Sequence, residues 1–109
     1  MKINILGTEY SVEIVQRAND PSLEENDGYC DETTKRCVVE SMEGCVGPGY
    51  KGNIQAHRNK VVRHEIIHAF LYESGLAENC DWAASEAMVD WLAIQLPRIM
   101  AACLEAGCI

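Results

Sequence analysis

The sequence predicts an α+β domain in which a small antiparallel sheet of about three strands precedes about three helices. The first third of the chain alternates apolar and polar side chains with the period of two that is typical of strands. The second half repeats apolar side chains at helical spacing. A length of 109 residues suits one core of modest size. Residues 1–109 are therefore expected to form a single minimal domain.

The strands are expected to begin with a hairpin. Residues 3–5 and 10–15 alternate apolar and polar side chains on either side of a glycine turn. Residues 19–36 are polar and rich in turn formers, which predicts a loop with a short helical turn around Leu23. Residues 37–40, Cys-Val-Val-Glu, predict a short third strand.

The first long helix is expected from about Asn53 to Ser74. Residues 44–52 hold four glycines and a proline, and they form the flexible connection that precedes it. Apolar side chains then recur at helical spacing, and Gly75 is suited to end the helix. This helix is expected to carry the chemistry of the chain.

A second helix is expected from Trp82 to about Leu96, with Asp81 as its N-cap. Pro97 lacks the amide proton that a helix interior needs, so it predicts either a kink or the start of a new helix. The remaining residues, 98–106, have helical character, and Gly107 lies near the end.

The first long helix contains the segment His64-Glu65-Ile66-Ile67-His68. Positions i and i+4 share a face of a helix, so both imidazoles can reach one metal ion. Glu65 is rotated by about 100° from His64 and is expected beside a bound water rather than among the ligands. This arrangement is typical of zinc hydrolases, with two ligands and one general base.

A catalytic zinc usually has three protein ligands and one open position for water. No histidine follows His68, and Leu71 stands where the HExxHxxGxxH pattern needs a glycine. His57 lies two helical turns before His64, about 10 Å along the axis, and is expected to be a surface or cleft histidine. The third ligand must therefore be a carboxylate.

Glu86 and Asp90 are the favoured carboxylates, because their spacing of four places both on one face of the next helix. If that face packs against the histidines, Glu86 can ligate the metal. Asp90 can then accept a hydrogen bond from the non-ligating nitrogen of a motif histidine. Glu73 is an alternative that is expected to point away, and Glu78 and Asp81 lie in the connection, where capping or solvation is favoured.

This pattern resembles that of the gluzincins, the thermolysin-like metallopeptidases. From the hairpin through HEIIHAFLYESGL to EAMVDWLAIQLP, the chain looks like a minigluzincin, a minimal single-domain scaffold of prokaryotes and their phages. The resemblance implies zinc as the metal, with His64, His68 and Glu86 as its ligands. It implies Glu65 as the general base and Asp90 as the hydrogen-bond acceptor that orients a ligand histidine. It also implies hydrolysis of peptide bonds.

The resemblance further implies that residues 37–40 form an edge strand against which an extended peptide or protein substrate pairs antiparallel. Two departures from the gluzincin pattern stand out. Ser85 occupies the position where many gluzincins have asparagine, and no residue is assigned to stabilise the oxyanion. Tyr29, Tyr50 and Tyr72 are candidates for that role, each with a structural role as the alternative.

Two other functions compete with a peptidase. A zinc-stabilised interaction module would use the metal only to hold a small core together. Structural zinc sites, however, usually have four Cys or His ligands and need no glutamate beside them, so Glu65 favours an enzyme. A latent peptidase is the other alternative, in which the C-terminal tail lies in the cleft and a Cys108 thiolate takes the open zinc position.

Composition limits the classes of partner and the location that we expect. A net charge of −8 argues against nucleic acid, which needs a basic surface. No stretch approaches 18 apolar residues and no signal-peptide core is found, so we expect no membrane span and a cytoplasmic location. Six cysteines without CxxC spacing are expected to be reduced and to pack as small apolar groups. A second metal site at Cys30, Cys37 and Cys45 is the less favoured alternative.

Overall fold

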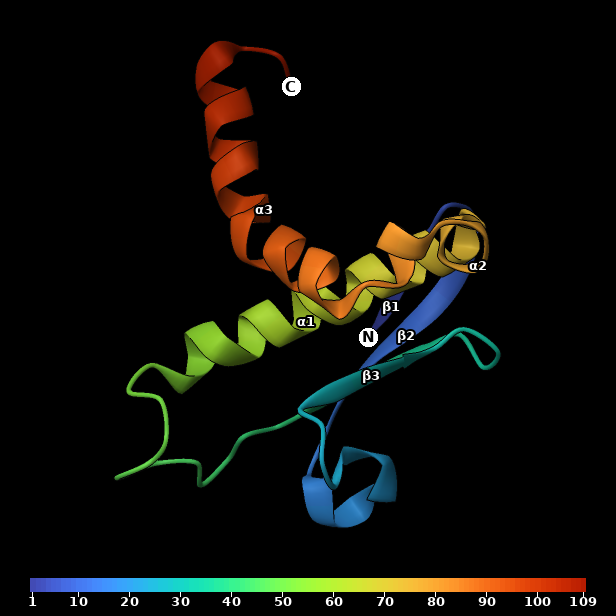
Figure 1. The fold of residues 1–109 in the computed structure, drawn as a ribbon. Helices are drawn as coiled ribbons and strands as arrows, with labels where there is room; N and C mark the ends of the chain where they lie inside the picture. The colour runs from blue at the N-terminus through green and yellow to red at the C-terminus, as the bar shows by residue number, and fades with distance from the viewer.

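The computed structural model describes all 109 residues. A four-stranded sheet is followed by three helices, which confirms the α+β class. In Figure 1, α1 lies between the sheet and α3, so the molecule has three layers. The strands are β1 (Lys2–Ile5), β2 (Thr8–Val15), β3 (Gly28–Asp31) and β4 (Arg36–Glu40), and the helices are α1 (Ile54–Glu73), α2 (Leu76–Asn79) and α3 (Glu86–Ala106).

The N-terminal hairpin forms as predicted. β1 and β2 pair antiparallel, with Ile5 opposite Thr8. The two residues between these strands, Leu6 and Gly7, both have positive φ angles, 51° and 91°. Positive φ at both positions is what a type I′ turn requires, and this turn matches the twist of the strands it joins.

The sheet differs from the predicted one in two respects. Its strand order is β1-β2-β4-β3, and β2 and β4 pair in parallel, so the sheet is mixed rather than antiparallel. Residues 28–31, within the predicted loop, form the strand β3. The predicted strand 37–40 lies within β4, which is an interior strand and not an edge strand. The edge beside α1 is β3.

Helix α1 agrees with its prediction to within one residue at each end. The Asn53 side chain accepts a hydrogen bond from the backbone N–H of Ala56 at 3.0 Å, which caps the N-terminus. Gly75 follows the helix with a φ angle of 83°, the left-handed conformation that glycine adopts without steric cost. The buried core beneath α1 combines Ala69 with residues of the sheet, namely Ile5, Tyr10, Val12 and Cys37.

Helix α3 begins later than predicted. Asp81–Ala84 form a 3-10 turn, and the hydroxyl of Ser85, rather than Asp81, accepts the capping hydrogen bond, from the N–H of Met88 at 3.4 Å. Pro97 lies inside the helix, and Figure 1 shows a bend about halfway along α3. A kink is thus found, and no new helix starts there.

Candidate metal centre

Three side chains converge where α1 meets the first turn of α3. His64 Nε2 lies 2.9 Å from Glu86 Oε2, and His68 Nε2 lies 3.0 Å from Glu86 Oε1. The two Nε2 atoms are 3.2 Å apart. One ligand atom from each of the three residues lies within 4.8 Å of the others, so the cluster can hold a metal ion. Two imidazoles and one carboxylate are a donor set suited to zinc.

The local sequence explains why these groups meet. His64 and His68 are one turn apart on α1, and their side chains are 14% and 11% exposed. The cap at Ser85 starts α3 so that Glu86 is its first residue, with a side chain that is 72% exposed. The Glu86 carboxylate is thus held by the two imidazoles rather than by burial, and the helix N-terminus favours its charge.

Asp90 lies behind His64, as predicted. His64 Nδ1 is 3.1 Å from Asp90 Oδ1, which leaves Nε2 facing the other ligands. Lys60 Nζ lies 3.0 Å from the same oxygen. Burial opposes ionisation of Asp90, but hydrogen bonds from Lys60 and His64 outweigh it and lower the pKa of that carboxyl below its ordinary value. Sequence reasoning missed this role of Lys60, although its position four residues before His64 on the same helix face was an available signal.

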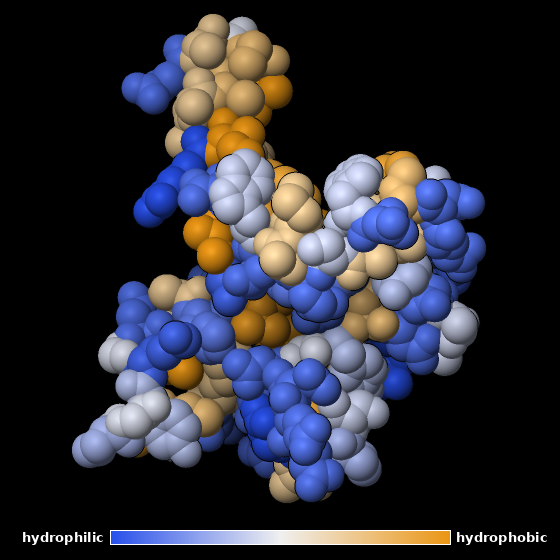
Figure 2. All heavy atoms as spheres, viewed as in Figure 1, coloured by the Kyte–Doolittle hydropathy of each residue, from blue (hydrophilic) through white to orange (hydrophobic).

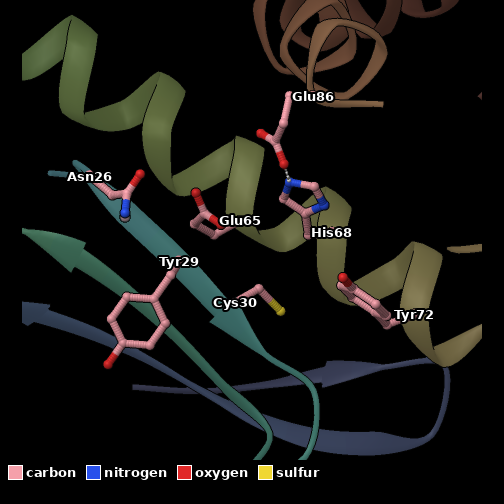
Figure 3. Close-up of a pocket in the computed structure, with 8 residues that line it drawn as sticks. Asn26, Tyr29, Cys30, Glu65, His68, Tyr72 and Glu86 are labelled. Atoms are coloured by element: carbon pink, nitrogen blue, oxygen red, sulfur yellow. Dashed lines mark ion pairs between the residues drawn. The ribbon is translucent and has the colours of Figure 1, made fainter. Parts of the chain in front are cut away.

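Glu65 is outside the ligand set and is buried, with 6% of its surface exposed. Figure 3 shows it between α1 and β3, in the pocket that also contains His68 and Glu86. Burial raises the pKa of Glu65 to about 7, His64 opposes this shift, and the charge of Glu86 adds to it. A carboxyl with such a pKa both accepts and returns a proton near neutral pH.

Gly28 allows β3 to approach the motif closely. A Cβ atom at this position would lie 2.9 Å from Val61 Cγ1, 3.0 Å from the Val38 carbonyl oxygen and 3.2 Å from Glu65 Cγ. Glycine therefore permits the edge strand to lie directly against Glu65. The pocket beside the ligands is bounded by this strand and by α1, and its lining residues are Asn26, Gly28, Tyr29, Cys30, Glu65, His68, Tyr72 and Glu86.

The three tyrosine candidates differ in where their hydroxyls lie. Tyr29 donates to Asp20 Oδ2 at 2.7 Å, and its ring points away from Glu65 and His68 in Figure 3. Tyr50 lines a separate pocket. Tyr72 is one turn beyond His68, with ring centroids 6.3 Å apart, and it lines the pocket beside the ligands. Its pKa is raised, chiefly by burial. Tyr72 is therefore the candidate whose hydroxyl is available to the pocket.

The alternative carboxylates and the third histidine lie elsewhere. Glu73 accepts hydrogen bonds from Tyr10 at 2.8 Å and from Thr8 at 3.2 Å, so it points away as predicted. His57 Nε2 lies 2.8 Å from Asp27 Oδ2 and contacts none of the ligands. Glu78 and Asp81 are also absent from the cluster.

The cysteines form no second metal site. All six are free. Cys30 and Cys37 face each other across β3 and β4, whereas Cys45 packs with Val39 and Met42 in a different cluster. The Cys108 thiol donates to the Cys103 carbonyl at 3.4 Å, and Figure 1 places the C-terminus at the far end of α3. The tail is thus not brought to the metal centre in this structure.

No family model, no curated protein and no solved structure matches this chain. The class that the fold and the site define is therefore an α+β domain with a candidate His-His-Glu metal centre.

Proposed function

We propose that the chain is a zinc-dependent peptidase that hydrolyses peptide bonds, with His64, His68 and Glu86 as ligands and Glu65 as general base. One observation carries the proposal. A buried carboxylate with a pKa of about 7 lies beside three converging ligands without belonging to them. A structural metal site has no use for such a group, whereas hydrolysis needs it.

When bound, zinc lowers the pKa of a coordinated water towards ~7 and polarises the carbonyl of the scissile bond. Glu65 accepts the proton of the attacking water and then passes it to the amine that leaves. The Tyr72 hydroxyl donates a hydrogen bond to the carbonyl oxygen as negative charge develops on it. Asp90 holds the His64 ring so that Nε2 remains a ligand atom.

An extended peptide is the substrate class that suits the edge of the sheet. β3 has β4 on one side only, so its other side offers unpaired backbone N–H and C=O groups. A peptide added there in the antiparallel direction would run beside Glu65, because Gly28 places β3 against that side chain. β3 thus takes the substrate-binding role that the resemblance implies for residues 37–40.

The proposal is tested by measuring metal content and cleavage on one preparation. Inductively coupled plasma mass spectrometry should find one zinc per chain, and a peptide library should be cleaved. Zinc without cleavage would favour the interaction module. That second candidate has support of its own, since α3 buries only Val89 and Ala93 and the metal centre joins it to α1.

Tyr72→Phe is expected to lower kcat by about 10²–10³-fold with little change in KM, because the lost donor acts only on the developing oxyanion. Steady-state kinetics on a cleaved library peptide measures both constants. Tyr29→Phe is the matched control, since its hydroxyl is engaged by Asp20 and it should retain activity. An unchanged kcat in Tyr72→Phe would contradict the role.

Asp90→Ala is expected to weaken zinc binding by about 10–100-fold, because His64 loses the acceptor that orients it. Competition with a chromophoric zinc chelator measures the affinity. Glu25→Ala, on an exposed loop, controls for the loss of one negative charge. Equal affinities for the two variants would show that Asp90 does not support the ligand.

A further inference from the structure

The second half of α3 projects from the body of the protein. We call residues 97–106 the α3 arm. Figure 1 shows it extending away from α1 and the sheet, and of its ten residues only Cys103 is not exposed. Figure 2 shows apolar surface along this projection. Ile99, Met100 and Leu104 are 41%, 48% and 63% exposed. An apolar surface of this continuity usually marks an interaction site.

The only charged residues of the α3 arm are Arg98 and Glu105. Neither forms an ion pair or a side-chain hydrogen bond within the chain. Their separation of seven residues places them about 20° apart around the helix and about 10 Å apart along it. Ala101 and Ala102 lie between them on the same side of the helix. The arm thus carries one positive and one negative end, with small side chains at its centre.

A membrane fits this helix poorly. By length and composition α3 is apolar enough to cross one, contrary to the sequence prediction, and only 11% of the apolar window is buried. Its first turns, however, supply Glu86 and Asp90 to the contacts with His64. The part beyond Asp90 rises by about 24 Å, less than the roughly 30 Å of a bilayer core, and Arg98 lies in its middle.

We propose that the α3 arm is a homodimerisation surface on which the arms of two copies pack antiparallel about a twofold axis between Ala101 and Ala102. In this arrangement Arg98 of each copy faces Glu105 of the second copy, so both charges gain partners. A parallel arrangement would instead place like charges opposite each other. The two alanines allow close approach of the helices, and Ile99 and Leu104 lie at the margins of the contact, each about 110° around the helix from its centre.

An isologous contact of this kind needs a surface that is complementary to itself. The α3 arm meets that condition, because a twofold axis at its centre exchanges its positive and negative ends. Packing of Ala101 and Ala102, with Ile99 and Leu104 at the margins, supplies the apolar part of the contact, while the two ion pairs select the antiparallel direction. The proposal does not depend on the metal centre or on peptidase activity, since no residue of the arm belongs to the cluster.

Charge reversal tests the arrangement directly. Sedimentation equilibrium of the wild-type chain, in reducing agent so that Cys103 and Cys108 form no disulfide, should give a dimer. R98E places two glutamates opposite each other at each end of the contact, and E105R places two arginines there. Each variant alone should dimerise at least about tenfold more weakly, because like charges then meet at both ends.

An equimolar mixture of R98E and E105R should recover the dimer. R98E has glutamate at both positions and E105R has arginine at both, so each end of the mixed dimer joins one glutamate to one arginine. Glu25→Arg, a charge reversal far from the arm, should dimerise like the wild type. Leu104→Ser should also weaken the dimer, with unchanged far-UV circular dichroism. A monomeric wild type would overturn the proposal, and so would a mixture that remains monomeric. Flotation of the wild type with phosphatidylcholine vesicles, without a dimer, would assign the arm to lipid instead.

Discussion

Glu65→Gln is expected to abolish peptide hydrolysis while zinc remains bound. The amide has nearly the size of the carboxylate, so it fits the space between α1 and β3, but it cannot accept the proton of the attacking water. General-base catalysis contributes about 10²–10⁴-fold, and kcat should fall by at least that factor. Hydrolysis of a library peptide gives the rate, and mass spectrometry gives the zinc content of the same sample.

The fold should tolerate this change. Burial already raises the pKa of Glu65 to about 7, so the site accepts a neutral group at little cost. Near-ultraviolet circular dichroism should therefore be unchanged. Glu25→Gln, on an exposed loop, is the control for the chemical change itself. Undiminished hydrolysis in Glu65→Gln would remove this residue from the mechanism, whereas loss of zinc would show that Glu65 supports the ligands.

The parts of the fold that the sequence predicted correctly are those with local signals. Helix α1 has a side-chain cap at Asn53 and a left-handed glycine at position 75, and both signals act within one turn of the helix. The motif lies inside that helix, so the geometry of His64 and His68 followed from the helical period alone. Glu86 needed one further assumption, that α3 packs against α1, and the structure meets it.

The missed features depend on contacts between distant residues. β3 has only four residues, and two of them, Gly28 and Asp31, are turn formers in sequence terms. The strand forms because its backbone pairs with β4, and because glycine fits against α1 where a side chain would not.

The predicted start of α3 at Trp82 was wrong for a related reason. Asp81 and Ser85 are both good N-caps, and only the extended backbone at Ser85 decides between them.

His68→Ala is expected to lose both the metal and much of the stability of the chain. The ligands join α1 to α3, and α3 itself buries little, so binding of the metal is coupled to folding. A ligand that is present at about 100 times its dissociation constant adds about 2.7 kcal/mol to the free energy of unfolding. For a domain of this size that corresponds to roughly 10–20 °C in Tm.

Thermal unfolding with and without chelator separates the metal from the packing of the histidine. The wild type should lose this increment of Tm on addition of EDTA, and His68→Ala should lose nothing further. Any difference in Tm between the two proteins in EDTA then measures the effect of losing the histidine side chain alone. His57→Ala, which removes a histidine outside the cluster, should remain sensitive to EDTA. A Tm of His68→Ala that still falls in EDTA would mean that zinc is held by other residues, and the proposed ligand set would then be wrong.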